Sequence, residues 1–172
     1  SSERPMIGFC PGAEFGPAKR WPHYHYAELA KQLIDEGYQV VLFGSAKDHE
    51  AGNEILAALN TEQQAWCRNL AGETQLDQAV ILIAACKAIV TNDSGLMHVA
   101  AALNRPLVAL YGPSSPDFTP PLSHKARVIR LITGYHKVRK GDAAEGYHQS
   151  LIDITPQRVL EELNALLLQE EA

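Results

Sequence analysis

Cysteines, long apolar runs and excess positive charge are all scarce in this sequence, and each scarcity narrows the class of protein. The three cysteines, Cys10, Cys67 and Cys86, lie far apart and form no CxxC pair. A disulfide framework and a cysteine-based metal or redox site are therefore disfavoured. We expect buried, reduced thiols in a cytosolic protein.

The charge balance argues against a nucleic-acid partner. The formal net charge is −5 at pH 7. Proteins dedicated to nucleic acids draw much of their affinity from a cationic surface, which this composition does not offer.

No apolar run reaches the roughly 18 residues that a membrane-spanning helix needs. The most apolar segment, 76–90, is interrupted by Asp77, Gln78 and Lys87, and we interpret it as a buried helix leading into a strand. The sequence opens without a secretory signal and reaches an expected strand soon after Ser1. We therefore expect a domain that belongs to a longer protein.

The sequence does contain the material for one globular domain. Its 172 residues are 46% hydrophobic and 20% charged, which suits a single domain with a substantial core. Strand-like and helix-like segments alternate along it. Strands are expected at 6–10, 40–43, 69–70 (weakly), 88–91, 107–110 and 128–132. Helices are expected through 27–34, through 55–59, from 76, in the alanine-rich stretch after Gly95, and over 156–169.

Local signals mark several ends of these elements. Gly37 is a natural end for the first helix, and Thr155 before a proline is typical of the start of the last one. The segment 74–77 resembles a capping box, with Asp77 in place of the usual glutamate. Residues 133–150 look irregular.

Alternating strands and helices predict an α/β fold with a Rossmann-like, doubly wound parallel sheet. In such sheets a ligand lies beyond the carboxyl ends of the strands, where the strand order reverses. We therefore expect the loops after Cys10, Phe43, Thr91 and Leu110 to converge on one site.

The stretch around which the site is expected runs from 87 to 103. A short apolar strand stops at Asn92, and a helix follows at once. The free N–H groups and the dipole at such a helix start favour an anion. A carboxylate, a hydroxyl and an imidazole follow the strand, on Asp93, Ser94 and His98. Together they suit a phosphorylated, polyhydroxy ligand.

These side chains allow two other interpretations. A catalytic triad is disfavoured, because Ser94 and His98 lie four apart on one helix and no GxSxG motif is present. The simpler alternative makes Asp93 or Ser94 a helix cap and His98 a half-buried packing residue. If a diphosphate binds here, like charge should turn Asp93 towards sugar hydroxyls instead.

The loop 12–22 carries glycines and two cations, Lys19 and Arg20, but is not a Walker A motif because the spacing is wrong. It either binds phosphate or is a surface turn with solvated cations, and the loop alone favours neither. A metal site at His23 and His25 is disfavoured, since residues two apart at a helix start diverge.

Five motifs, taken in order, resemble the ADP-heptose–lipopolysaccharide heptosyltransferase family. The similarity covers about residues 5–122, and the last helix fits as well. The motifs lie at 11–13 with 19–22, at 41–45, at 69–74, at 92–98 and at 111–113.

The resemblance implies a fold and an activity. It implies that residues 1–172 form a single nucleotide-sugar-binding domain, the carboxyl-terminal half of a two-domain glycosyltransferase B enzyme. The intact enzyme would transfer heptose, with inversion, from ADP-L-glycero-D-manno-heptose to a heptose of the lipopolysaccharide core. The acceptor site and the catalytic base would lie in the missing amino-terminal domain. No cofactor or obligatory metal is implied. The expected location is the cytoplasm, with the cytoplasmic face of the inner membrane left open.

The resemblance also implies roles for individual residues. Lys19 would contact the diphosphate and stabilise the leaving group, and the backbone at Gly12 and Ala13 would lie beside it. Further donor contacts would come from the ends of the later strands. Asp48, close to Ser45, would reach the ribose, and Leu70 to Thr74 would border the adenine. Asp93 would contact the heptose. Ser94, Gly95 and His98 would hold phosphate, and Met97 belongs to the same donor-binding segment.

The sequence departs from the family pattern in two places. Glu14 and Phe15 stand where relatives have small hydroxyl residues, and 133–150 lacks a cysteine-rich pattern found in many relatives. A rival interpretation is a non-catalytic nucleotide-binding module, or a domain like a nucleotide-sugar 2-epimerase, with the same fold. Such an epimerase would bind uridine rather than adenosine nucleotides.

Overall fold

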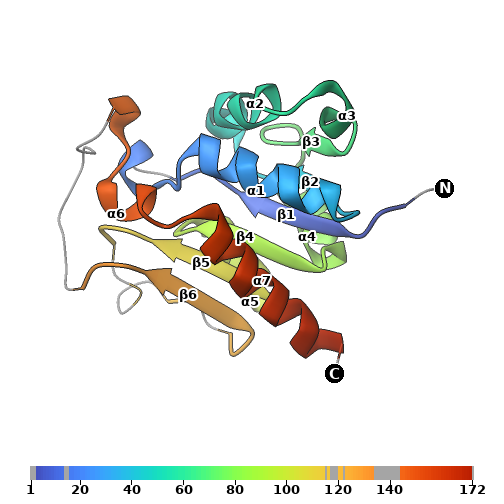
Figure 1. Cartoon of the computed structure of the whole chain (residues 1–172). Helices are drawn as coiled ribbons and strands as arrows, with labels where there is room; N and C mark the ends of the chain where they lie inside the picture. Colours follow the sequence, from blue (N-terminus) through green and yellow to red (C-terminus); the bar gives the residue numbers. More distant parts are fainter. Residues whose placement is uncertain are drawn as a thin grey trace.

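Six parallel strands form one sheet in a computed structural model that describes residues 3–13, 16–114, 116, 120–121, 123–133 and 144–171. The strand order is β3-β2-β1-β4-β5-β6 (Figure 1). This order reverses between the neighbours β1 and β4, as in doubly wound Rossmann-like sheets. The strands are β1 (Met6–Cys10), β2 (Gln39–Leu42), β3 (Cys67–Asn69), β4 (Ala88–Asn92), β5 (Leu107–Tyr111) and β6 (Ala126–Arg130).

Helices cover both faces of this sheet (Figure 1). Helices α1 and α7 pack on one face with α2, and α4 and α5 pack on the other. The α-helices are α1 (His23–Asp35), α2 (His49–Ala57), α3 (Thr61–Gln64), α4 (Leu76–Ala85), α5 (Gly95–Ala102), α6 (Gln149–Ile152) and α7 (Pro156–Glu171). Three short 3-10 turns are η1 (Pro17–Lys19), η2 (Ala46–Asp48) and η3 (Ala144–Gly146).

Each face has its own apolar core, because successive strand residues point to opposite sides. Ile7 and Phe9 of β1 enter the core beneath α1 and α7. Val41 of β2 and Ile89 of β4 enter the core beneath α4 and α5. The four central strands β1, β2, β4 and β5 are buried on both faces, which explains their near-continuous apolar sequences and agrees with the predicted fold class.

The two helix ends marked most clearly in the sequence are confirmed. Gly37 adopts a left-handed φ of 102° after α1, and the next amide, of Tyr38, donates back to the Leu33 carbonyl at 3.0 Å. Thr155 accepts a 3.1 Å hydrogen bond from the Arg158 amide at the start of α7, which ends two residues beyond the expected 169.

Three local predictions are wrong. The reciprocal cap of α4 is shifted by one residue: the Gln75 amide donates to Gln78 at 2.9 Å, because a glutamine side chain is available one position later. The last strand lies at 126–130 rather than 128–132, since Ala126 pairs with Leu107 in the register of β5. Residues 149–152 form α6 inside the segment expected to be irregular. Residues 134–143 of that segment lie outside the described residues, as do Glu14 and Phe15.

The cysteines are buried and free, as expected. Desolvation raises the pKa of each of the three thiols to about 12. No helix in the described part of the chain is both long enough and apolar enough to span a membrane.

Candidate functional site

A cavity of about 420 Å³ lies beyond the carboxyl ends of β1, β2 and β4, at the reversal of the strand order. Three of the four loops expected to converge therefore do so. The cavity also reaches the first residue of α4 and the first turns of α5. Its lining is Cys10, Gly12, Ala13, Phe43, Gly44, Ser45, Lys47, Asp48, Leu76, Ser94, Gly95, Leu96 and Val99.

The loop after β5 does not follow that prediction. None of its described residues lines the cavity. Instead the Arg130 guanidinium donates to the carbonyls of Gly112 (3.0 Å) and Pro113 (3.3 Å). A side chain at Gly112 would meet Leu151 of α6 at 2.7 Å. This loop packs against β6 and α6 because β5 is one strand removed from the reversal point.

The start of α5 borders the cavity, and its cap-position side chain accepts from none of the described helix amides. Ser94 occupies the cap position in an extended conformation, but within the described chain no helix amide donates to its hydroxyl. That hydroxyl lies 3.3 Å from the hydroxyl of Thr91 instead. The interpretation of the Ser94 side chain as a helix cap is therefore wrong. The open N–H groups make this helix start suited to an anion.

Two neighbouring residues of α5 lie outside the cavity. Met97 is fully buried in the core, and its sulfur accepts a 3.3 Å hydrogen bond from the Tyr111 hydroxyl. A donor contact through the Met97 side chain, implied by the resemblance, conflicts with this placement. His98 is exposed and is not part of the lining, so its interpretation as a half-buried packing residue is also wrong.

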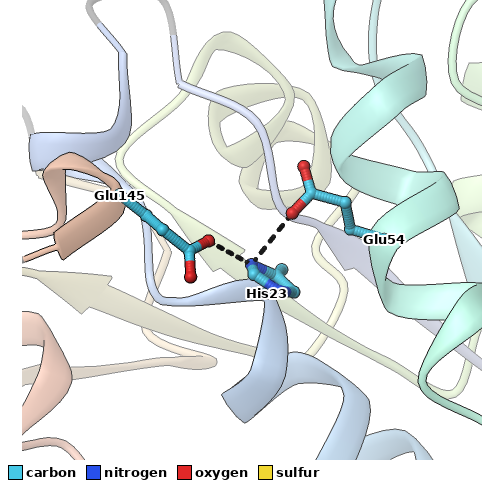
Figure 2. A group of neighbouring side chains, drawn as sticks. All are labelled: His23, Glu54 and Glu145. Atoms are coloured by element: carbon cyan, nitrogen blue, oxygen red, sulfur yellow. Dashed lines mark ion pairs between the residues drawn. The ribbon is translucent and has the colours of Figure 1, made fainter.

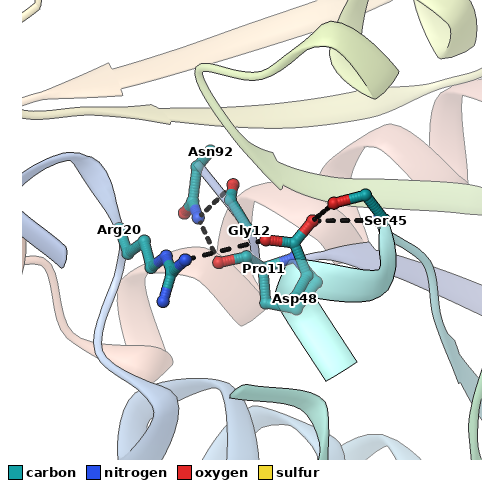
Figure 3. A network of polar contacts seen from close by, with 6 residues as sticks. All are labelled: Pro11, Gly12, Arg20, Ser45, Asp48 and Asn92. Atoms are coloured by element: carbon teal, nitrogen blue, oxygen red, sulfur yellow. Dashed lines mark hydrogen bonds and ion pairs between the residues drawn. The ribbon is translucent and has the colours of Figure 1, made fainter. Parts of the chain in front are cut away.

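Asp48 joins the loops that follow β1 and β2 (Figure 3). Its Oδ2 accepts from the backbone amide (2.9 Å) and hydroxyl (3.1 Å) of Ser45, and its Oδ1 lies 3.6 Å from the Arg20 guanidinium. A Cβ at Gly12 would fall 2.3 Å from the Asp48 carboxylate, and one at Gly44 would fall 2.8 Å from its Cβ. Glycine is required at both positions, because only its bare backbone leaves room for this buried carboxylate.

The two cations of the first loop have different surroundings. Arg20 is partly buried, so its interpretation as a solvated surface cation is wrong. Its Nε and the Oδ1 of Asp48 are buried and have no hydrogen-bond partner among the described residues. Lys19 is half-buried at the end of η1 and does not line the cavity.

Leu70, Glu73 and Thr74, three of the five residues predicted to border the adenine, line a second cavity. It has a volume of about 420 Å³, and its lining is Arg68, Leu70, Glu73, Thr74, Gln78, Ile81 and Leu82. The loop that carries these residues is hydrogen-bonded to the loop after β2, because the Gly72 amide donates to the Gly44 carbonyl at 3.0 Å.

Asn92 is the site residue whose importance the sequence interpretation missed. It is fully buried at the end of β4, and its side chain contacts the loop after β1 (Figure 3). The sequence pattern marks it only as the residue at which a strand stops. The sequence does place the side-chain amide of Asn92 directly at the end of an apolar strand. A buried amide there needs hydrogen-bond partners, which indicates a structural role.

One group of three among the described side chains could hold a metal ion: His23, Glu54 and Glu145 (Figure 2). His23 Nδ1 lies 3.3 Å from Glu54 and 3.6 Å from Glu145, but also 2.7 Å from the Tyr147 hydroxyl. None of these residues lines the cavity. His25 turns away to the Ile152 carbonyl at 2.7 Å, so the two histidines diverge as predicted.

The parallel sheet and the cavity at its reversal point define a Rossmann-like α/β ligand-binding domain. More particularly, the chain belongs to glycosyltransferase family 9, the heptosyltransferases, because the model of that family matches residues 1–148. This confirms the family resemblance found in the motifs.

Individual relatives agree with this assignment. The chain is 94% identical over 170 residues to lipopolysaccharide heptosyltransferase 2 of Salmonella typhimurium, covering 99% of this chain and 49% of that protein. It is 70% identical to lipooligosaccharide heptosyltransferase 2 of Haemophilus influenzae, covering 96% and 48%. The solved structure of Escherichia coli ADP-heptose lipopolysaccharide heptosyltransferase II matches with a TM-score of 0.92 at 94% identity, covering 100% and 49%. The chain thus spans about half the length of these relatives.

Proposed function

We propose that this chain is the donor-binding, carboxyl-terminal half of a two-domain glycosyltransferase B enzyme, and that its cavity binds ADP-L-glycero-D-manno-heptose. The enzyme adds the second heptose to the lipopolysaccharide inner core, with inversion at the anomeric carbon. The uncapped start of α5 at the cavity carries this proposal. The 94% identity to a protein named ADP-heptose lipopolysaccharide heptosyltransferase II identifies the nucleotide sugar that would place its anionic diphosphate there.

The diphosphate is where charge develops during transfer. As the bond between the anomeric carbon and the phosphate oxygen breaks, negative charge builds on the departing ADP. The N–H groups at the start of α5 and the ammonium of Lys19 are the proposed stabilisers. One preorganised donor of this kind is worth about 3–4 kcal/mol in the transition state. Ser94 would hold the phosphates, and Asp93 would turn to the heptose hydroxyls, because it repels a diphosphate.

The nucleoside end of the donor would lie over the loops after β2 and β3. The Oδ1 of Asp48 is a buried acceptor with no hydrogen-bond partner among the described residues, which suits a ribose hydroxyl. Leu70 and Thr74 line the neighbouring cavity, where the adenine would bind.

The reaction also needs a base to take the proton from the acceptor hydroxyl. We assign this base and the acceptor site to the amino-terminal half, outside this chain. No step in this scheme requires a metal, a nucleic acid or a membrane-spanning segment. The proposed location is the cytoplasm, where the lipid-linked acceptor would bring the enzyme to the inner membrane.

Calorimetry and turnover test this proposal together. The 172-residue chain should bind ADP and not UDP, and it should transfer no heptose by itself. The full-length enzyme that contains it should transfer heptose from ADP-heptose to a core that already carries one heptose. Binding of UDP in preference to ADP would favour the epimerase-like alternative, and turnover by the isolated chain would contradict the assignment of the base.

A further inference from the structure

We propose that Asn92 is a positioning residue that holds the loop between β1 and α1 against the end of β4, and thereby sets where Lys19 lies relative to the start of α5. This inference rests on the proposed function, which assigns Lys19 to the diphosphate of the donor.

The side chain of Asn92 makes four hydrogen bonds to the protein. Its Nδ2 donates to the carbonyls of Pro11 (2.7 Å) and Gly12 (3.2 Å). Its Oδ1 accepts from the Trp21 amide (3.0 Å) and the Tyr26 hydroxyl (2.8 Å). An asparagine amide has two N–H donors and two acceptor lone pairs, so this side chain is saturated. It therefore acts through the residues it holds rather than by contacting a ligand.

The held residues are the two ends of one loop. Pro11 and Gly12 open the loop after β1, and Trp21 closes it just before α1. Trp21 is fixed a second time, since its indole N–H donates to the Ile154 carbonyl at 2.8 Å. Lys19 lies two residues before this anchored tryptophan, so its backbone position depends on the loop end that Asn92 holds.

The same loop is tied to the cavity on its other side. Arg20, next to Lys19, pairs with Asp48, whose carboxylate packs against Gly12. Asn92 is also two residues before Ser94 at the start of α5. One side chain thus fixes the distance between the two proposed contacts to the diphosphate, across the β1–β4 boundary where the strand order reverses.

Substitutions at this position should separate positioning from mere stability. Asn92→Asp keeps the shape and the Oδ1 acceptor, but it turns a carboxylate oxygen towards two carbonyl oxygens and loses both donors. If Asn92 acts by placing Lys19, its effect on turnover should largely disappear once Lys19 is removed. If it only stabilises the fold, the two effects should multiply, as they do for independent sites.

The experiment is a double-mutant cycle in the full-length enzyme, at a temperature well below every unfolding midpoint. Asn92→Asp should lower kcat about tenfold in the wild-type background and less than about threefold in the Lys19→Ala background. Val90→Ala is the matched control, because it weakens the same strand in the core and removes no side-chain hydrogen bond to the loop. The control should lower kcat by less than about twofold in either background.

An equal fold-loss from Asn92→Asp in both backgrounds would overturn the inference. If Asn92→Asp does not fold, Tyr26→Phe replaces it in the cycle, because it removes one of the two hydrogen bonds to Oδ1. Its smaller loss should again vanish in the Lys19→Ala background, and its persistence there would overturn the inference. If Lys19→Ala alone leaves turnover unchanged, the proposed role of Lys19 fails instead, so the two failures are distinguishable.

Discussion

The loop between β1 and α1 and the junction between β4 and α5 follow neighbouring strands, yet they use their polar groups in opposite ways. In the loop, the carbonyls of Pro11 and Gly12 and the amide of Trp21 all bond to Asn92. At the junction, no helix amide of the described chain bonds to the Ser94 hydroxyl, and the start of α5 opens to the cavity.

This difference shows that some polar groups of the site stabilise its structure while others remain available to a ligand. Polar groups that already have protein partners hold the loop between β1 and α1 in place, and we call this held loop the frame. The uncapped donors at the start of α5 remain for an anion from outside the protein. The cost of leaving the helix start uncapped is small because Gly95 is exposed, so that water can bond to its amide. The following predictions test this division, from the largest expected effect to the smallest.

Removal of the Lys19 ammonium should have the largest effect. Lys19→Ala in the full-length enzyme should lower kcat by about 10²–10³-fold, because a preorganised charge on the leaving group acts mainly in the transition state. Affinity for ADP, measured by calorimetry, should fall by a smaller factor. Unchanged turnover would show that the first loop serves only as a frame.

A methyl group added at each of two cavity glycines should have different effects: one should lower stability, and the other should weaken ADP binding. Gly12→Ala places a Cβ 2.3 Å from the Asp48 carboxylate and should lower the free energy of unfolding by about 1–3 kcal/mol. Gly95→Ala meets nothing within 4 Å in the described chain, so it should keep stability but weaken ADP binding by occupying the cavity. Thermal unfolding and calorimetry on both variants decide, and equal losses of stability would contradict the division.

The two helix starts with hydroxyl residues should respond differently to alanine. Thr155→Ala removes a true cap of α7 and should cost about 1 kcal/mol of unfolding free energy. Ser94→Ala removes a hydroxyl to which no described amide of α5 donates, and it should change that free energy by less than about 0.5 kcal/mol. A loss at Ser94 as large as that at Thr155 would mean that α5 is capped by its own side chain.

The rate of Cys10 alkylation should show the smallest effect, and it reports only on whether the loop after β1 stays closed over this residue. Burial raises the pKa of Cys10 to about 12, so almost none of it is thiolate at pH 8. Alkylation at pH 8 should be slow, with or without ADP. Because the unfolded thiol ionises near 9.0, its protonated folded state contributes stability that falls as pH rises from about 9 towards 12. Rapid labelling of Cys10 in the folded chain would show that the loop above it opens.

Much of the fold could be predicted from the sequence, because its signals are local. Apolar strands, Gly37 and Thr155 mark their elements through backbone preferences that the structure retains. The site's position also followed, since the order of elements fixes where strand ends meet.

The contacts that build the site were harder to predict, because they join residues far apart in the chain. The hydrogen bonds from Asn92 to Pro11 and Trp21 span 81 and 71 residues of sequence. No local sequence pattern around these residues predicts such bonds. Met97 has the same difficulty: only the packed structure shows that it turns into the core and bonds to Tyr111.

The structure of this chain bound to ADP tests the central claim most directly. We predict that the diphosphate lies at the start of α5, with phosphate oxygens within hydrogen-bond distance of the Gly95 and Leu96 amides, and that the Asn92 hydrogen bonds are unchanged. A diphosphate bound elsewhere, with the α5 amides facing only solvent, would contradict the claim.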